Sequence, residues 1–278
     1  MISIEQNWKR YFIDHNEGMG TTYERFILHR YFQMLSERFD IKSILEVPSF
    51  GMTGVSGINS MWWAAKGVQV TVMDDDEVRA GLISEVWRGL DLPFRMLCQK
   101  GFSSLPFDDN SFDMAWNFAA LRFQSGVPAM LREMARVSKK AVFICIPNRW
   151  NIFNLFRKSD KTGQSRSKQP DDSAQGIREV MEQQNWQLAE EGYLDVPPWP
   201  DIAMAKEDML RKMGMGFIAD RMQRRDNPGI CILDWLNGKD PQMEERVLKY
   251  DLLENLPDPI KKFWAHHQYF LFIPGNEN

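Results

Sequence analysis

Two acidic residues close short apolar runs, and glycines lie between them. Glu46 stands near the end of the first run and Asp74 ends the second, with Gly51 and Gly54 in the stretch that joins them. A βαβ unit that binds a nucleoside needs a glycine turn for close backbone approach and an acid that accepts hydrogen bonds from the ribose hydroxyls. The pattern predicts a nucleoside site, although acidic strand ends also occur as ordinary solvated caps.

Alternating strand and helix patterns would position these acids. The predicted strands are 43–47, 68–74, 94–98, 112–118 and 140–146, and the predicted helices between them are 55–66, 77–89 and 127–138. Strands that are apolar almost throughout, alternating with helices, predict a parallel sheet covered on both faces.

Helical spacing also marks both ends of the chain. Residues 3–15 and 21–38 predict two core-facing helices before the first strand, and 173–185 predicts a helix after the fifth. Strands are expected at 186–195 and 266–273. Residues 197–262 are too long for an ordinary connection and carry helical patterns near 203–224 and 240–255, so a helical insertion is predicted.

A longer motif narrows the class. Residues 105–113 read Leu-Pro-Phe-Asp-Asp-Asn-Ser-Phe-Asp, residues 131–137 read Leu-Arg-Glu-Met-Ala-Arg-Val, and an apolar strand pattern follows at 141–147. Together with Glu46 and Asp74, in this order, they resemble class I S-adenosylmethionine-dependent methyltransferases. The resemblance covers roughly residues 40–150.

The resemblance implies an α/β, Rossmann-like, doubly wound seven-stranded sheet, mostly parallel with an antiparallel last strand. It implies an enzyme that uses S-adenosylmethionine to methylate a small-molecule acceptor. The expected division is an N-terminal helical cover at 1–40, the methyltransferase core at 41–196, a helical insertion acting as a lid at 197–262, and the final core strand at 263–278.

The resemblance also assigns cofactor contacts. Glu46 would lie beside the methionine part of the cofactor, Gly51 and Gly54 would form the close-approach turn, and Asp74 would bind the ribose diol. The remaining implied contacts are to the adenine for Asp75, Phe102 and Ser103, and to the methyl-donor centre for Asn117. Structural roles stay open as well: a charge at a helix N-terminus for Asp75, core packing for Phe102, and a turn cap for Asn117.

Three positions depart from the family pattern. Pro48 and Phe50 stand where glycines are usual, and Gly101 stands where an acid usually binds the adenine amine. Proline fixes φ and removes a donor, and the phenyl ring adds bulk at the approach surface. A non-catalytic binding protein on a degenerate methyltransferase fold is therefore kept as an alternative.

Methyl transfer from a sulfonium needs mainly alignment and exclusion of water, so neither a catalytic triad nor a metal cluster is expected. Adjacent His266 and His267 would point to opposite faces of a strand, and one of them could act as a general base. Tyr193, Asp195 and Asp201 are the other candidates for a base. Each of these residues could equally serve a packing role.

Charge and composition limit the partners. The net charge of −4 gives no global basic field, so nucleic acid is not expected, although an RNA or protein methyltransferase stays an alternative if the basic stretch 157–168 lines a groove. Three scattered cysteines without a Cys-x-x-Cys pair argue against disulfides or structural zinc. No run approaches membrane-span or signal-peptide character, so a cytoplasmic location is expected.

Overall fold

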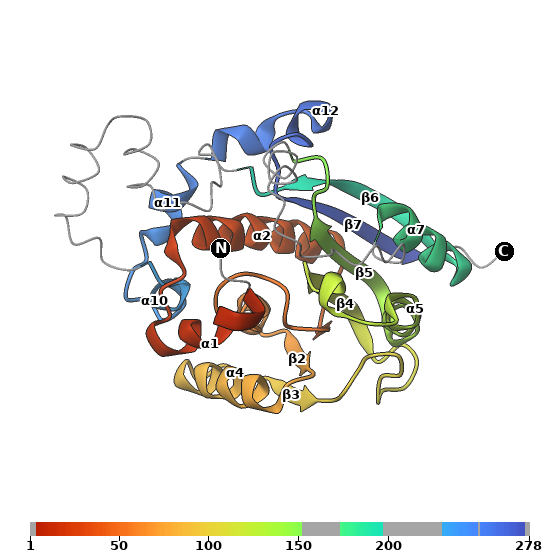
Figure 1. The fold of residues 1–278 in the computed structure, drawn as a ribbon, viewed down its shortest axis with the longest axis horizontal. Helices are drawn as coiled ribbons and strands as arrows, with labels where there is room; N and C mark the ends of the chain where they lie inside the picture. Colours follow the sequence, from red (N-terminus) through yellow and green to blue (C-terminus); the bar gives the residue numbers. More distant parts are fainter. Residues whose placement is uncertain (1–3, 152–172, 197–229, 250, 276–278) are drawn as a thin grey trace.

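The computed structural model describes residues 4–151, 173–196, 230–249 and 251–275. Seven strands form one sheet with helices on both faces (Figure 1). They are β1 (Ser43–Glu46), β2 (Gln69–Asp74), β3 (Arg95–Cys98), β4 (Phe112–Phe118), β5 (Ser138–Pro147), β6 (Trp186–Leu194) and β7 (His267–Pro274). Their order is β3-β2-β1-β4-β5-β7-β6, and β7 alone runs antiparallel to its neighbours. The predicted doubly wound sheet is confirmed.

The strand order changes direction at β1, because β2 and β3 lie on one side of it and β4 and the later strands lie on the other. β1 pairs with β2 on one side and with β4 on the other, so that Glu46 lies opposite Val72 and Trp116. Ligands of open α/β sheets bind outside the carboxyl ends of the strands at such a switch point. The fold therefore brings the predicted acids, Glu46 and Asp74, to the edge where a ligand is expected.

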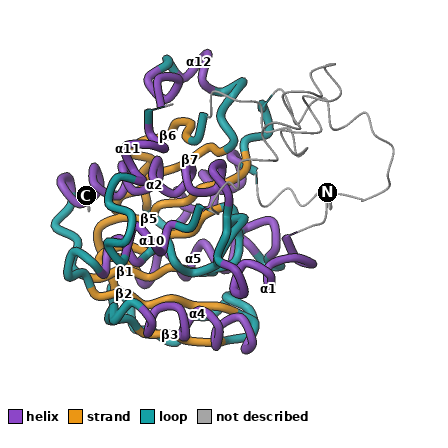
Figure 2. Tube along the Cα trace, turned by 90° about the vertical axis from the view of Figure 1, so that its left-hand side faces the viewer, coloured by secondary structure: helices purple, strands orange, loops and turns teal. Residues whose placement is uncertain are grey.

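Two apolar layers hold the helices against the sheet. On one face, α2 (Gly18–Arg38), α3 (Met61–Ala64) and α4 (Glu77–Gly89) share a buried cluster with strand residues. On the other face, α5 (Val127–Val137) and α7 (Ala174–Gln183) form a second cluster. Figure 2 shows β3 with α4 at one end of the sheet and β6 at the other.

Short helices complete the described chain. They are α1 (Ile4–Asp14), η1 (Leu121–Phe123), α10 (Ile232–Leu236), α11 (Met243–Leu248), η3 (Asp251–Asn255) and α12 (Asp258–Lys261). α10 and α11 pack into the same buried cluster as α2, where the rings of Phe26 and Trp235 lie 5.1 Å apart. The predicted helix at 203–224 and the basic stretch 157–168 lie outside the described residues.

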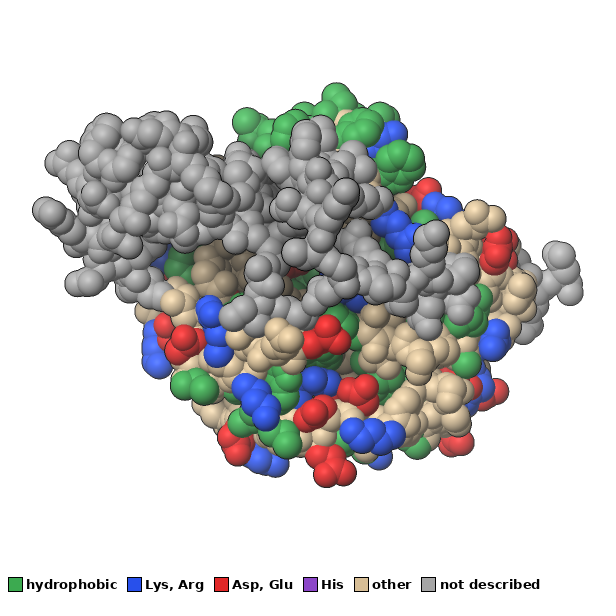
Figure 3. All heavy atoms as spheres, viewed as in Figure 1, with side chains coloured by type: hydrophobic (Ala, Val, Ile, Leu, Met, Phe, Trp, Pro, Cys, Tyr) green, Lys and Arg blue, Asp and Glu red, His purple; other side chains and the backbone are tan. Residues whose placement is uncertain are grey.

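Hydrophobic side chains gather on the surface around α12 (Figure 3). Leu252, Ile260, Phe263 and Trp264 are exposed there. Leu252 and Ile260 belong to the predicted insertion 197–262, and Phe263 and Trp264 directly follow it.

The predicted helix at 55–66 is wrong over its first half. Only Met61–Ala64 is α-helical, and the preceding residues form a buried loop of bends and turns. Gly54 and Gly57 have φ values of 102° and 68°, which a continuous right-handed helix does not allow. The apolar spacing of Val55 and Ile58 therefore reflects burial of a loop, since both are almost fully buried.

Gly51 lets this loop lie directly against the end of β4. A Cβ added there would lie 2.6 Å from the backbone nitrogen of Ala120 and closer still to the carbonyl oxygen of Phe118. We expect Gly51→Ala to lower the free energy of unfolding by more than about 2 kcal/mol, because backbone atoms must move to admit the methyl group.

Urea denaturation followed by circular dichroism measures this loss. Gly81→Ala is the matched control, because a Cβ on this α4 residue meets nothing within 4 Å; it should leave stability unchanged or raise it by about 0.5–1 kcal/mol. Equal stability of the two variants would contradict the packing of the loop on β4.

Candidate functional site

Asp74 is fully buried, and the protein itself occupies both of its carboxylate oxygens. Arg79 donates from Nη2 to Oδ1 over 2.7 Å and from Nε to Oδ2 over 2.8 Å. The Ser49 hydroxyl donates to Oδ2 over 2.5 Å, and the Asp76 backbone N–H donates to Oδ1 over 2.9 Å. The carboxylate predicted to bind a ribose diol therefore already accepts hydrogen bonds on both oxygens from groups of the protein itself.

Arg79 is held in this position from several sides. The Asp76 side chain caps α4 by accepting from the Arg79 backbone N–H over 2.9 Å, and Asp75 accepts from Nη2 over 2.8 Å. The guanidinium lies 4.1 Å from the ring centre of Phe50 and 5.3 Å from that of Trp8. Such cation–π contacts favour a desolvated cation.

In this conformation these residues do not fit S-adenosylmethionine bound as the resemblance implies. The guanidinium of Arg79 takes the Asp74 oxygens that the ribose hydroxyls would need, and Gly51 faces the backbone of β4. Phe50 is only 6% exposed and packs 5.0 Å from Phe123, centre to centre. A ligand could bind Asp74 only after Arg79 and Phe50 move.

Glu46 is buried beneath the same loop and is 3% exposed. Its Oε2 accepts a hydrogen bond from the Ser60 hydroxyl over 2.6 Å, and that hydroxyl oxygen accepts from the Trp116 indole N–H over 3.1 Å. Burial raises the pKa of the Glu46 carboxyl to about 7, against the opposing effects of Ser60 and Arg25. The residue thus changes protonation near neutral pH.

Gly54 faces a buried ion pair. Arg25 of α2 donates to both oxygens of Glu17, over 2.7 Å and 2.5 Å, and to the carbonyl of Val55 over 2.8 Å. The Val55 backbone N–H in turn donates to Glu17 over 2.6 Å. A side chain at Gly54 would collide with the Glu17 carboxylate, so this glycine fits the loop around the ion pair.

The other predicted cofactor contacts are dispersed. Asp75 binds Arg79, Phe102 is buried in the second apolar cluster, and Ser103 is exposed. Asn117 is fully buried, and its Oδ1 has no hydrogen-bond partner among the described residues. No ligand contact of these four residues is tested by the structure, so their cofactor roles stay predictions.

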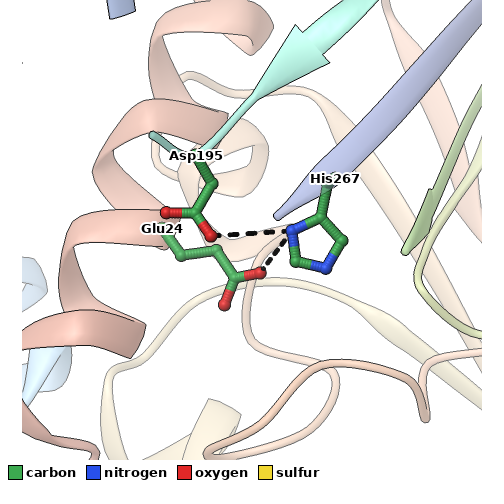
Figure 4. Close-up of side chains that lie close together, drawn as sticks. All are labelled: Glu24, Asp195 and His267. Carbon is green, nitrogen blue, oxygen red and sulfur yellow. Dashed lines mark ion pairs between the residues drawn. The ribbon is translucent and has the colours of Figure 1, made fainter. Parts of the chain in front are cut away.

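A second cluster brings the predicted histidines together with two acids. Figure 4 shows His267 of this cluster with Glu24 and Asp195. His266 Nδ1 lies 2.8 Å from Asp195 Oδ2. His267 Nδ1 lies 3.0 Å from Glu24 Oε1 and 3.6 Å from the same Asp195 oxygen. Tyr193 is opposite Gln268 on β7, and burial raises the pKa of its phenol.

This cluster lies beside the carboxyl end of β4, because the rings of His267 and Phe118 are 4.6 Å apart. Burial lowers the pKa of His267. Burial alone would raise the pKa of Asp195, but the charges and hydrogen bonds of His266 and His267 outweigh it and lower that pKa. An acid that binds one imidazole nitrogen leaves the other nitrogen of that ring to accept a proton.

Glu24 was missed by the sequence analysis. The apolar spacing of Tyr23, Phe26 and Ile27 predicts a core-facing helix and draws attention away from the charges between them. Glu24 and Arg25 are nevertheless both buried. Two adjacent opposite charges inside an otherwise apolar stripe were the available signal, since buried charges need partners.

Comparisons with known proteins agree with this fold. Residues 51–146 match the family model described as a methyltransferase domain. No curated protein matches the chain.

Two solved structures align over most of the chain. A putative sarcosine dimethylglycine methyltransferase from Galdieria sulphuraria aligns with a TM-score of 0.54 and 12% identity, over 90% of this chain and 85% of that one. A complex of the Haloferax volcanii Trm112 methyltransferase activator with a putative methyltransferase gives 0.52 and 14%, over 99% of each chain. At these identities the likeness concerns the fold.

The sheet order and the matched domain together define a class I methyltransferase fold. Residues 51–146, which match the methyltransferase domain, span β2 to β5 of this fold. Within the described residues, no helix combines the length and apolar character needed to cross a membrane.

The pKa of Glu46 predicts a pH-dependent stability. Because the folded-state pKa of about 7 exceeds the ordinary value of 4.5, the stability due to its proton is present below pH 4.5 and is lost as the pH rises through 7. Glu46→Gln carries no such charge, so its stability relative to the natural protein should rise by about 3 kcal/mol between pH 4.5 and pH 8. Urea unfolding at a series of pH values measures the difference, and parallel pH curves for the two proteins would contradict it.

Proposed function

We propose that the protein transfers a methyl group from S-adenosylmethionine to a small molecule bound beside His266. The observation that carries the proposal is the pair formed by His266 Nδ1 and Asp195 Oδ2, 2.8 Å apart, next to the carboxyl edge of the sheet. The cofactor supplies an activated methyl group, so the protein must mainly align the acceptor and accept its proton. Asp195 orients the His266 ring, and Nε2 of that ring is the base.

A small acceptor is favoured over a macromolecule by charge. The chain carries a net charge of −4, which gives no general attraction for a polyanion. The basic stretch 157–168, which could support RNA binding, lies outside the described residues. The proposed partner is therefore a small molecule with an ionisable hydroxyl or amine, and a cytoplasmic location stays an expectation from the sequence.

A specific observation favours the second candidate, a non-catalytic binding protein. Arg79 binds both oxygens of Asp74, the acid that the resemblance assigns to the ribose, and it packs against Phe50, which stands near the position of a family glycine. A permanently closed site would leave the fold intact and remove catalysis, since function belongs to the site rather than to the fold.

Replacing Phe50 by Gly separates the two candidates. Calorimetric titration with S-adenosylmethionine and S-adenosylhomocysteine is expected to show binding by the natural protein, and binding at least as tight by Phe50→Gly, because the ring no longer has to move. Binding that appears only in the glycine variant would show that the natural pocket is closed, and the enzyme proposal would then be dropped. Thermal unfolding checks that both proteins are folded.

Asp74 tests the ribose contact itself. Asp74→Asn keeps the size of the side chain but removes its charge, and is expected to weaken S-adenosylmethionine binding by about 1.5–3 kcal/mol through the loss of charge-assisted hydrogen bonds. Asp108→Asn, which changes an exposed carboxylate without a predicted cofactor contact, is the control. Full affinity in Asp74→Asn, in a protein that remains folded, would place the ribose elsewhere.

A further inference from the structure

We propose that Glu24, Asp195 and His267 form a binding site for a divalent first-row transition-metal cation. One donor atom from each residue lies within 4.8 Å of the other two (Figure 4). A metal is not expected from the sequence, because the three residues are far apart in the chain. The fold brings them together from α2, from the residue after β6 and from the first residue of β7.

The spacing of the donors suits a shared ion. His267 Nδ1 is 3.0 Å from Glu24 Oε1 and 3.6 Å from Asp195 Oδ2. Ligands that bind one ion at about 2.0–2.2 Å are roughly 3–3.6 Å apart when their bonds to the metal meet at 90–110°. Both distances fall in this range.

The His267 nitrogen has the character of a ligand rather than of a hydrogen-bond donor. Nδ1 is buried and forms no aligned hydrogen bond with the described residues, despite its closeness to Glu24. A neutral nitrogen with its lone pair free to bind is the form that metals require.

The two carboxylates of the site are buried, so a bound cation would offset the repulsion between their charges. The side chains of Glu24 and Asp195 are 10% and 4% exposed. Two carboxylates brought close together in a region of low dielectric repel one another, and a shared divalent ion reverses that repulsion.

The surroundings fix the donors in place. Asp195 has a φ of 66°, a strained conformation for a residue other than glycine, and strain of this kind gathers at functional sites. The Asp195 backbone carbonyl accepts a hydrogen bond from the His266 backbone N–H over 2.9 Å, and Asp195 Oδ2 lies 2.8 Å from His266 Nδ1. His266 is thus a positioning residue for the ligand Asp195, as outer-shell partners of metal ligands commonly are.

The donor set selects the kind of ion. One imidazole nitrogen with two carboxylate oxygens suits Mn²⁺, Fe²⁺, Co²⁺ or Zn²⁺ better than Mg²⁺ or Ca²⁺, which prefer oxygen alone. Three protein ligands leave coordination positions open, as in catalytic sites. If the proposed function holds, an oxygen of the acceptor would bind at one of these positions; the metal site itself does not depend on that function.

Metal titration tests the site without any cofactor. The full chain, free of affinity tag and stripped with a chelator, is titrated calorimetrically with Mn²⁺, Co²⁺, Zn²⁺ and Mg²⁺. One transition ion per chain is expected, bound at least tenfold more tightly than Mg²⁺, and the Co²⁺ absorption spectrum should report nitrogen and oxygen ligands. Affinity should fall at low pH, where protons compete for His267.

Variants locate the ion. Glu24→Gln and His267→Gln should each weaken binding at least tenfold, and His266→Gln should weaken it less while retaining the three ligands. Glu245→Gln, an exposed change on α11, should leave affinity unchanged. Circular dichroism confirms that each variant is folded. No binding by the folded natural protein, or full binding by both ligand variants, would overturn the proposal, and neither result bears on S-adenosylmethionine binding.

Discussion

Compensation of buried carboxylates governs the structure at the carboxyl ends of β1 and β2. Three acids are buried there. Asp74 and Glu17 each pair with a guanidinium, that of Arg79 and that of Arg25, whereas burial raises the pKa of Glu46 and so favours its neutral form. Removing one partner of a buried ion pair typically costs about 3–5 kcal/mol. The loop after β1 therefore follows the path that keeps these pairs intact.

Helix α2 connects the two halves of the candidate site. Consecutive residues of an α-helix point about 100° apart, so neighbours serve different surroundings. Arg25 reaches the glycine loop through Val55 and Asn59, whereas Glu24 reaches His267 beside β4. A shift of this helix would therefore move a group on the proposed cofactor side and a group on the proposed acceptor side together.

The sequence predicted the elements better than it predicted their contacts. The helix at 77–89 and the strand at 112–118 match α4 and β4 to the residue, because continuous apolar runs and the Asp76 cap are local signals. The glycine loop was mistaken for a helix because burial of a loop imitates helical spacing. The Asp74–Arg79 pair was within reach of the sequence, because the end of β2 and the first turn of α4 are only five residues apart.

The contacts that decide function are the least local. Phe50 and Trp8 come from distant parts of the chain and both pack against Arg79. Glu24 and His267 are separated by most of the chain and lie in contact. These contacts depend on how α1, α2 and β7 pack against the rest of the protein. The residue pattern within a single segment does not determine that packing. The pair of histidines was found because it could do chemistry, whereas its acidic partner on α2 was hidden among core residues.

The Asp74–Arg79 pair also limits which ligand can enter. Complete loss of a buried pair, at about 3–5 kcal/mol, would lower the apparent affinity of a ligand by roughly two to four orders of magnitude. Arg79 has a less costly alternative, because its Nη2 also binds Asp75, whose side chain is 35% exposed. If Arg79 left Asp74 and kept Asp75, each Asp74 oxygen would lose one donor and retain one, from Ser49 or from the Asp76 N–H. Two adjacent hydroxyl groups of a ligand would replace both lost donors, whereas a single donor would replace one.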